Sequence, residues 1–331
     1  MSRQNNQLVL HSDVQPYLLN ATLFTDYAHK LRTVTIPEGH LVTASSAGPL
    51  NFPVGSIISK TFYYPIAEGG VLQVDDDGSL FNPDAGKKGG LDLTKAHLVE
   101  TRLLVHRQSG WVALPYVWND EQTDANLEVT GDIKTLELVN GTERRNFSYI
   151  VPDQNQCAGC HGTNTASKSL NPIGPKVANL HRNGYGGHQN QLDTWQADGW
   201  LEIKNKPVLA TKNWQDASNT LEDRARSYLD INCGHCHSEQ GPADTSGLYL
   251  DIATKHKMRL GECKLPIAAG QGTGGNKFSI VPGKPEESIL IYRMSSIDPG
   301  AMMPELGRSL VHDAGIALIS DWISEMDGNC N

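Results

Sequence analysis

Two copies of one short motif constrain this chain more than any other feature of its sequence. Cys157 and Cys160 are followed at once by His161, and the same C-x-x-C-H pattern recurs at residues 233–237. Two thiols at this spacing can hold a zinc ion, cycle as a redox disulfide, or carry a covalently attached haem. The fold must therefore provide a place for a zinc ion, a disulfide or a haem at each of the two motifs.

The second copy consists of Cys233, Cys236 and His237. Zinc sites built from four cysteines usually place their pairs about 15–20 residues apart, whereas Cys233 comes 76 residues after Cys157. A thioredoxin-like disulfide favours the strand-to-helix turn of a βαβ unit, and neither pair lies in such a pattern. The spacing therefore disfavours both of these roles.

The histidine of each motif favours haem. With 12 His among 331 residues, a His at one given position has a chance of about 4%, and at both positions about 0.13%. Zinc and redox roles need no His there, but a c-type haem does, because the thiols bond the porphyrin vinyl groups and the next residue brings an imidazole to the iron. The motifs predict two haems c, with His161 and His237 as iron ligands.

Covalent haem attachment in bacteria takes place outside the cytoplasmic membrane. The first ten residues lack the pattern of a signal peptide, so we expect that the signal has been removed and that the protein is periplasmic or extracellular. In an oxidising compartment Cys263 and Cys330 can pair, and a lone Cys330 beside the C-terminus would be exposed and reactive. We predict a disulfide between them; the alternative is two buried thiols.

The chain before the first motif reads as mostly β. Runs rich in β-branched and aromatic residues predict strands, and they occupy residues 55–65, 97–107, 110–118, 135–140 and 147–152. After a mixed segment with helical character at residues 189–200, residues 205–220 read as a connector. We therefore expect a mostly antiparallel β domain over residues 1–165 and a connecting segment over 166–220.

The last third of the chain reads as helical. Apolar positions at helical spacing predict helices over residues 221–232, 285–296 and 309–326, and the first of them leads directly to Cys233. A helix that ends in C-x-x-C-H, a loop, and a final amphipathic helix form the plan of a small class I cytochrome c. The predicted fold class is therefore α+β, with an all-α class I cytochrome c domain over residues 221–331.

The second axial ligands decide whether each haem also binds other molecules. Met303, in a loop before the last helix, is our candidate for the second haem; Met302 is the alternative, and both could instead lie in the core. A thioether ligand raises the reduction potential. His235, inside the second motif, is expected to point to solvent.

The first haem has no methionine nearby in sequence, so its sixth ligand is a His, another group, or nothing. The candidate histidines are His181 and His188 downstream, and His40, His97 and His106 in the β region. An open sixth position would make this haem reactive.

The net charge of −9 argues against nucleic acid and anionic membranes as partners. No apolar run approaches the ~20 residues of a membrane span. The expected partners are redox proteins.

Seven segments distributed along the chain carry a resemblance: TLFTDYAHKLR, FPVGSIISKTFYYP, ETRLLVHRQSGWVALPYVWNDEQTDA, NQCAGCH, RARSYLDINCGHCH, IVPGKPEESILIYRM and MMPELGRSLVHDAG. Over nearly its whole length, the sequence resembles a bacterial family of uncharacterised diheme c-type cytochromes. The resemblance implies two haems and export, and a parallel β-helix protein as a possible partner, but no substrate.

The N-terminal half more faintly resembles the β-sheet monohaem cytochromes, namely cytochrome c′-beta and its hydroxylamine-oxidising relatives. Phe52, Pro53 and Gly55 precede a long strand here as they do there, and the C-x-x-C-H motif follows the sheet. In the oxidising relatives a strand lysine is cross-linked to the haem, and Lys60 is the corresponding candidate, although a surface lysine is the alternative.

Two functions follow from these patterns. The first is an exported diheme cytochrome that transfers electrons between two covalently bound haems. The alternative is a haem enzyme or small-ligand binder, whose first haem has an open distal side for nitrogen oxides, hydroxylamine or peroxide and whose second haem relays electrons. A zinc-bound structural module is a third, non-redox interpretation.

Overall fold

The structure is a computed structural model, and it describes residues 1–44, 49–76, 78–162, 169–185, 187, 189–204 and 210–330. The chain forms two compact units, each assembled from several sequence segments. Unit 1 comprises residues 1–19, 27–157 and 174–210, and unit 2 comprises residues 20–26, 158–173 and 211–331. The domain boundaries expected after residues 165 and 220 stay predictions.

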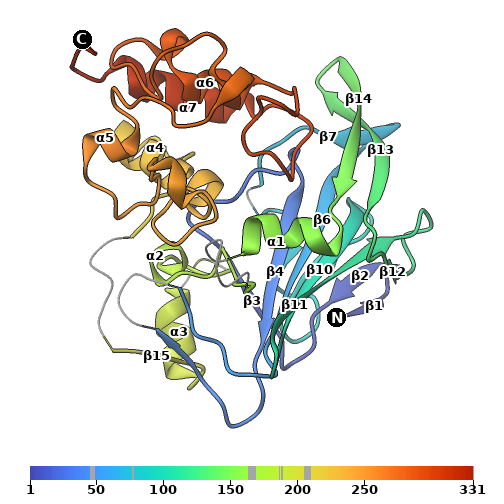
Figure 1. The fold of residues 1–331 in the computed structure, drawn as a ribbon. Helices are drawn as coiled ribbons and strands as arrows, with labels where there is room; N and C mark the ends of the chain where they lie inside the picture. Colours follow the sequence, from blue (N-terminus) through green and yellow to red (C-terminus); the bar gives the residue numbers. More distant parts are fainter. Residues whose placement is uncertain are drawn as a thin grey trace. The chain divides into compact units, whose positions relative to one another are not determined.

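Unit 1 is built around a large, mostly antiparallel sheet (Figure 1). Nine strands within the described residues form it, in the order β12–β11–β10–β6–β7–β13–β14, with β4 also paired to β6 and β3 paired to β4. Only β7 and β13 pair in parallel there. The strands are β3 (Gln15–Tyr17), β4 (His29–Thr35), β6 (Ile57–Ala67), β7 (Gly70–Leu72), β10 (Ala96–Arg107), β11 (Gly110–Trp118), β12 (Ala125–Leu127), β13 (Asp132–Asn140) and β14 (Glu143–Val151).

Smaller elements cover the edges and faces of unit 1. Four short strands form a second sheet: β1 (Ser2–Gln4), β2 (Gln7–Val9), β8 (Phe81–Asn82) and β9 (Gly90–Asp92). β5 (Val42–Ala44) pairs in parallel with β15 (Leu201–Ile203). The helices α2 (Val177–Leu180) and α3 (Gln191–Ala197) pack Leu180 and Trp195 into a core with the sheet residues Val34 and Ile58.

The five strands predicted from sequence are confirmed as β6, β10, β11, β13 and β14. Their burial follows the alternation that the sequence shows: in β14, Phe147, Tyr149 and Val151 are buried while the residues between them are exposed. An antiparallel strand with one buried face produces this pattern.

Unit 2 contains helices joined by long loops. The helices are α4 (Leu221–Leu229), α5 (Lys257–Leu260), α6 (Ile289–Ser295) and α7 (Asp313–Ser324), and α1 (Gln154–His161) crosses from unit 1 into unit 2. The core of unit 2 joins one face of α4 to α7, with Ala225 and Leu229 packed against Leu318 and Trp322. The helices expected near residues 221–232, 285–296 and 309–326 are therefore present.

The predicted fold class is wrong in its second half, because residues 221–331 are not an all-α class I cytochrome c domain. The protein is mostly β, and most of residues 235–288 is turn and loop, with isolated parallel bridges at Glu262–Ile280 and Phe278–Ser288. Gly247 and Gly261 take left-handed backbone conformations there, at φ 61° and 111°, which end a helix rather than continue it. The helical periodicity was real in three segments, but it did not extend to the chain between them.

A disulfide joins Cys263 to Cys330 across 67 residues, with the Cα atoms 5.2 Å apart. The predicted pairing is thereby confirmed. It ties the loop after α5 to the C-terminal end of the chain. Across the part of the chain that the structure describes, no helix is both long and apolar enough to cross a membrane.

Candidate cofactor site

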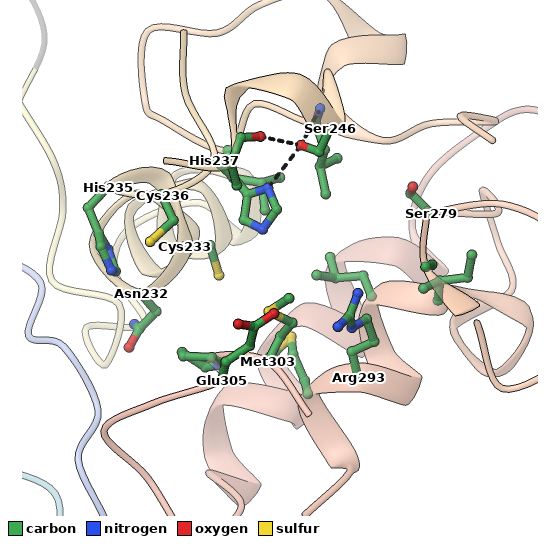
Figure 2. A pocket seen from close by; sticks show the side chains of 18 of the residues that line it. Asn232, Cys233, His235, Cys236, His237, Ser246, Ser279, Arg293, Met303 and Glu305 are labelled. Atoms are coloured by element: carbon green, nitrogen blue, oxygen red, sulfur yellow. Dashed lines mark hydrogen bonds between the residues drawn. The ribbon is translucent and has the colours of Figure 1, made fainter. Parts of the chain in front are cut away.

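Unit 2 encloses a cavity of about 720 Å³, within the range of ~300–1,000 Å³ typical of ligand and cofactor pockets. Among the residues singled out from the sequence, Cys233, Cys236, His237 and Met303 line it (Figure 2), together with Cys160 and His235. Most of the remaining lining is apolar and comes from α6, α7 and the loops that follow α5 and precede α7. A mostly apolar cavity with a few converging polar groups is typical of sites for small molecules and cofactors.

Helix α4 and the turn after it deliver the second motif to this cavity. The Thr220 side chain accepts a hydrogen bond from the Asp223 N–H at 3.1 Å, a cap that stabilises the first turn of the helix. The helix continues into a π-helical turn, Asp230–Gly234. A Cβ at Gly234 would lie 2.9 Å from the Asp251 Cα, so the close packing of this turn requires glycine between the two cysteines.

The two cysteines of this motif carry thiols. Burial raises the pKa of Cys233 to about 12. A hydrogen bond with Cys160, together with burial, raises the pKa of Cys236. Both shifts favour the protonated thiol.

His237 is held in one tautomer by Ser246. The Ser246 hydroxyl donates to the Ala243 carbonyl oxygen at 2.7 Å, so its oxygen accepts from the His237 Nδ1–H, 3.3 Å away. Burial lowers the pKa of His237 to about 4, so the ring is neutral at physiological pH. Nε2 keeps its lone pair, which is the form an imidazole needs to ligate iron.

Met303 lies on the side of the cavity that faces His237, with its sulfur toward the interior (Figure 2). Its backbone is held at both ends: its N–H donates to the Arg293 carbonyl oxygen at 3.0 Å, and its carbonyl oxygen accepts from Arg308 at 3.0 Å. The imidazole and the thioether thus face one cavity from opposite walls.

Arg308 organises the whole loop around Met303. Its guanidinium is 4% exposed and donates to the carbonyl oxygens of Arg293, Ser296 and Leu310 as well as Met303, at 2.8 to 3.2 Å. Such a buried cation needs compensation, and hydrogen bonds to carbonyl oxygens supply part of it.

Asp26 supplies the opposite charge, since it interacts electrostatically with Arg308. Its carboxylate accepts hydrogen bonds from the Ser309 N–H, the Ser309 hydroxyl and the Leu310 N–H, at 2.7 to 3.1 Å. Burial raises the pKa of Asp26, while these hydrogen bonds oppose the rise. Neither Asp26 nor Ser246 could have been identified from the sequence, because no motif connects them to the residues they hold.

Three further residues can be placed relative to the cavity: Met302, Met294 and His235. Met302, the alternative ligand, is buried at 7% exposure but does not line the cavity. Met294, which the sequence did not single out, does line it from α6. His235 was expected to point to solvent rather than to the iron, and this stays a prediction: the residue is partly exposed and lines the cavity, while its Nδ1 is buried without a hydrogen-bond partner among the described atoms.

The first motif occupies α1, which begins three residues after β14 ends. His161 forms a 2.7 Å hydrogen bond from Nδ1 to the Asn171 carbonyl oxygen, so Nδ1 carries the proton, as in His237. Gly159 and Cys160 line the cavity of the second motif, and the Cys236 Sγ lies 4.0 Å from the Gly159 carbonyl oxygen. Two motifs that are 76 residues apart in sequence therefore meet at one wall.

The candidate sixth ligands of the first haem lie in unit 1. His106 stacks on Trp111 with ring centroids 4.5 Å apart, and His40 bonds the Glu38 carbonyl oxygen. His97 lies in β10, and burial lowers its pKa. His181 follows α2.

His188 falls outside the described residues. Lys60 lies in β6, with its ammonium 5.3 Å from the Phe62 ring centroid. No geometry assigns any of these groups to the first haem, so the sixth ligand there stays open.

The residues around the cavity fit a c-type haem. Two adjacent neutral thiols, an imidazole with Nε2 available and a facing thioether are the groups that such a haem takes from a protein. By contrast, among the residues whose placement is described, no group of three or more His, Cys, Asp or Glu side chains is arranged to hold a metal ion directly.

No protein-family model, curated protein or solved structure matches this chain.

Proposed function

We propose that this protein is a diheme c-type cytochrome that transfers electrons. One observation carries the proposal: Cys233, Cys236, His237 and Met303 converge on a single cavity in unit 2. Haem iron with His and Met ligands exchanges single electrons at a comparatively high potential. The protein's own contribution is to hold these ligands in place and to exclude water around them.

Each residue of the site has a distinct part. Cys233 and Cys236 would provide the two thioether attachments of a haem, and His237, oriented by Ser246, would provide a nitrogen ligand to its iron. Met303 would provide a thioether ligand, and the hydrogen bond that its carbonyl oxygen accepts from Arg308 limits its movement.

The contact between the two motifs supports electron exchange within the chain. Cys160 shares the cavity wall with Cys236, so the covalent attachments of the two groups are neighbours. Short separations favour fast transfer between two redox centres. Cys157, Cys160 and His161 are the proposed attachment and proximal ligand of the first haem.

The Cys263–Cys330 disulfide supports the proposed location in the periplasm or outside the cell, because disulfides persist in oxidising compartments. The acidic balance of the chain, with 37 Asp+Glu against 28 Lys+Arg, suits docking to a basic redox protein. The proposed partner is therefore a redox protein with a basic docking surface.

Replacing Met303 tests the proposed ligand. We predict that Met303→Ala lowers the reduction potential of one haem and leaves the other unchanged, because the thioether stabilises the reduced iron. Met302→Ala is the matched control, since it removes a buried thioether from the same loop but not from the cavity wall. The measurement is a spectroelectrochemical titration of the holoprotein, and an unchanged pair of potentials in Met303→Ala would exclude this ligand.

A second candidate function, binding of a small ligand at the first haem, is favoured by one observation in unit 1. The Arg102 guanidinium interacts electrostatically with the Cys157 thiol, so a positive charge lies near the first attachment site. Carbon monoxide titration of the reduced holoprotein separates the two functions. No binding is expected if both irons are six-coordinate, and one equivalent per chain would favour the ligand-binding function.

A further inference from the structure

One arginine of α6 lies at the wall of the unit 2 cavity. Arg293 is partly buried and lines the cavity, and Figure 2 shows its guanidinium directed toward the interior. Its backbone carbonyl oxygen accepts a hydrogen bond from the Met303 N–H at 3.0 Å. One residue therefore holds the loop of the proposed thioether ligand through its backbone and presents its side chain to the cavity.

Two contacts fix the position of this guanidinium. Its Nε donates a hydrogen bond to the Ala301 carbonyl oxygen at 2.9 Å. Gly272, in the helical turn Gly270–Thr273, packs so closely that a Cβ there would lie 3.0 Å from the Arg293 Cζ. Within the described residues, the only side-chain hydrogen bond of Arg293 uses Nε. Nη1 and Nη2 therefore keep their donors, and the fork of N–H groups that they form matches the two oxygens of a carboxylate.

The charge that lines the cavity is mainly positive. Among the described residues, Lys264, Arg293 and Arg308 line it, and Glu305 is the only carboxylate that does. The Glu305 side chain is exposed, so its attraction for Arg293 is weakened by solvent. Burial lowers the pKa of His237 most, and the charges of Arg293 and Lys264 lower it further. Their field thus extends across the cavity, where it favours an anionic group.

The cysteines and the arginine lie on different sides of the cavity. Figure 2 shows the Cys233 and Cys236 thiols on one side, next to His237, and the Arg293 guanidinium across from them. A haem carries its vinyl groups and its two propionates on opposite sides of the porphyrin, so a ring attached at the cysteines extends its carboxylates away from them. In a mostly apolar cavity, a charge-assisted hydrogen bond at that far side is stronger than it would be in water.

We propose that Arg293 binds a carboxylate of the molecule that occupies the unit 2 cavity, through Nη1 and Nη2. Two sources share this chemistry. One is a propionate of the second haem, which rests on the proposed function, and the other is a free carboxylate, which does not. In either case Arg293 orients the bound molecule and does not ligate the iron.

Substitutions of Arg293 test this contact without changing the backbone carbonyl that holds Met303. Arg293→Met removes the guanidinium, and Arg293→Lys keeps a positive charge but not the fork of donors. Arg259→Met is the matched control, because Arg259 lies in the same unit, is 52% exposed and does not line the cavity.

Resonance Raman spectroscopy of the reduced holoprotein tests the haem source. The propionate bending band reports hydrogen bonds to the propionate oxygens. We expect this band to shift for one haem in Arg293→Met, to shift less in Arg293→Lys and to stay unchanged in Arg259→Met. The band separates a direct contact from a general effect of charge, which would alter the reduction potential alone.

Calorimetric titration of the purified protein with sodium propionate tests the free source. That source predicts saturable binding by the wild type, a loss of affinity of about tenfold or more in Arg293→Met, a smaller loss in Arg293→Lys, and wild-type affinity in Arg259→Met. The haem source predicts the band shift and no binding of free propionate. The absence of both the band shift and Arg293-dependent binding would overturn the proposal. If Arg293→Met does not fold, Arg293→Lys carries the same two tests.

Failure of this proposal and failure of the proposed function can be told apart. Covalent haem content is read from the intact mass of each variant. Propionate binding that depends on Arg293 in a chain without haem would sustain the carboxylate site and refute the cytochrome. Two haems per chain, with no band shift and no propionate binding, would do the reverse. A chain with neither haem nor propionate binding would overturn both.

Discussion

Replacement of Arg308 by Met tests how the Met303 ligand loop is held. The guanidinium is buried and donates to four carbonyl oxygens, of Arg293, Ser296, Met303 and Leu310. Met keeps an unbranched, largely apolar side chain, but it is shorter and offers no donor. The change therefore removes the hydrogen bonds while keeping most of the side-chain volume.

The expected cost follows from these contacts. A hydrogen bond that involves a charged group contributes about 1.5–3 kcal/mol, but four bonds from one guanidinium are not additive, and freed carbonyl groups can rebind water. The substitution also removes a positive charge that interacts with the buried Asp26 carboxylate. We expect the free energy of unfolding to fall by about 1.5–3 kcal/mol.

Two assays on the holoprotein check this expectation. Urea unfolding measures stability, and carbon monoxide titration of the reduced protein reports whether the second haem has lost its axial thioether. We predict lower stability together with new carbon monoxide binding. Arg259→Met is the control, because Arg259 is 52% exposed and pairs with an exposed glutamate, so its loss is expected to cost under ~1 kcal/mol. A loss of stability below about 1 kcal/mol for Arg308→Met, without carbon monoxide binding, would refute the role assigned to this arginine.

Three further predictions concern other parts of the structure. Ser246→Ala removes the hydroxyl that accepts from the His237 Nδ1–H, so the imidazole becomes a weaker electron donor to the iron. A redox titration is expected to show a higher reduction potential for one haem only. Ser246→Thr keeps the hydroxyl and is expected to restore the wild-type potential. The double change Cys263→Ser and Cys330→Ser opens a 67-residue loop. On the chain-entropy model it is expected to lower the free energy of unfolding in urea by up to about 4 kcal/mol. An unchanged free energy of unfolding would contradict a stabilising disulfide. Lys30→Met is expected to stabilise the protein against urea at pH 7, by about 1–4 kcal/mol. Folding lowers the pKa of Lys30, so the unfolded chain binds more protons and wild-type stability rises with pH toward the ordinary lysine pKa. The stability gained by Lys30→Met should therefore shrink from pH 7 to pH 10, and an unchanged or growing gain would contradict the lowered pKa of Lys30.

Local features of this chain could be predicted from sequence because they depend on near neighbours. Strand β14 shows its alternation in residues 143–151, and α7 shows its apolar stripe in residues 313–324. Cys233, Cys236 and His237 lie within five consecutive residues, so one turn of backbone is enough to bring them together. Each of these signals lies within about a dozen residues.

Features that depend on distant contacts could not be predicted. Asp26 bonds Ser309 across 283 residues of sequence, and Gly159 approaches Cys236 across 77. No periodicity or motif encodes such pairs. The class I cytochrome c assignment failed for a related reason, since it extrapolated from three helices to the glycine-rich loops between them.

The intact mass of the purified protein, measured under denaturing conditions after expression in a host that exports it and attaches haem, tests the central claim most directly. The account predicts a mass increase equal to two haems, with the attachments mapped by peptide digestion to Cys157 and Cys160 and to Cys233 and Cys236. A chain of unmodified mass, colourless after purification from such a host, would contradict it.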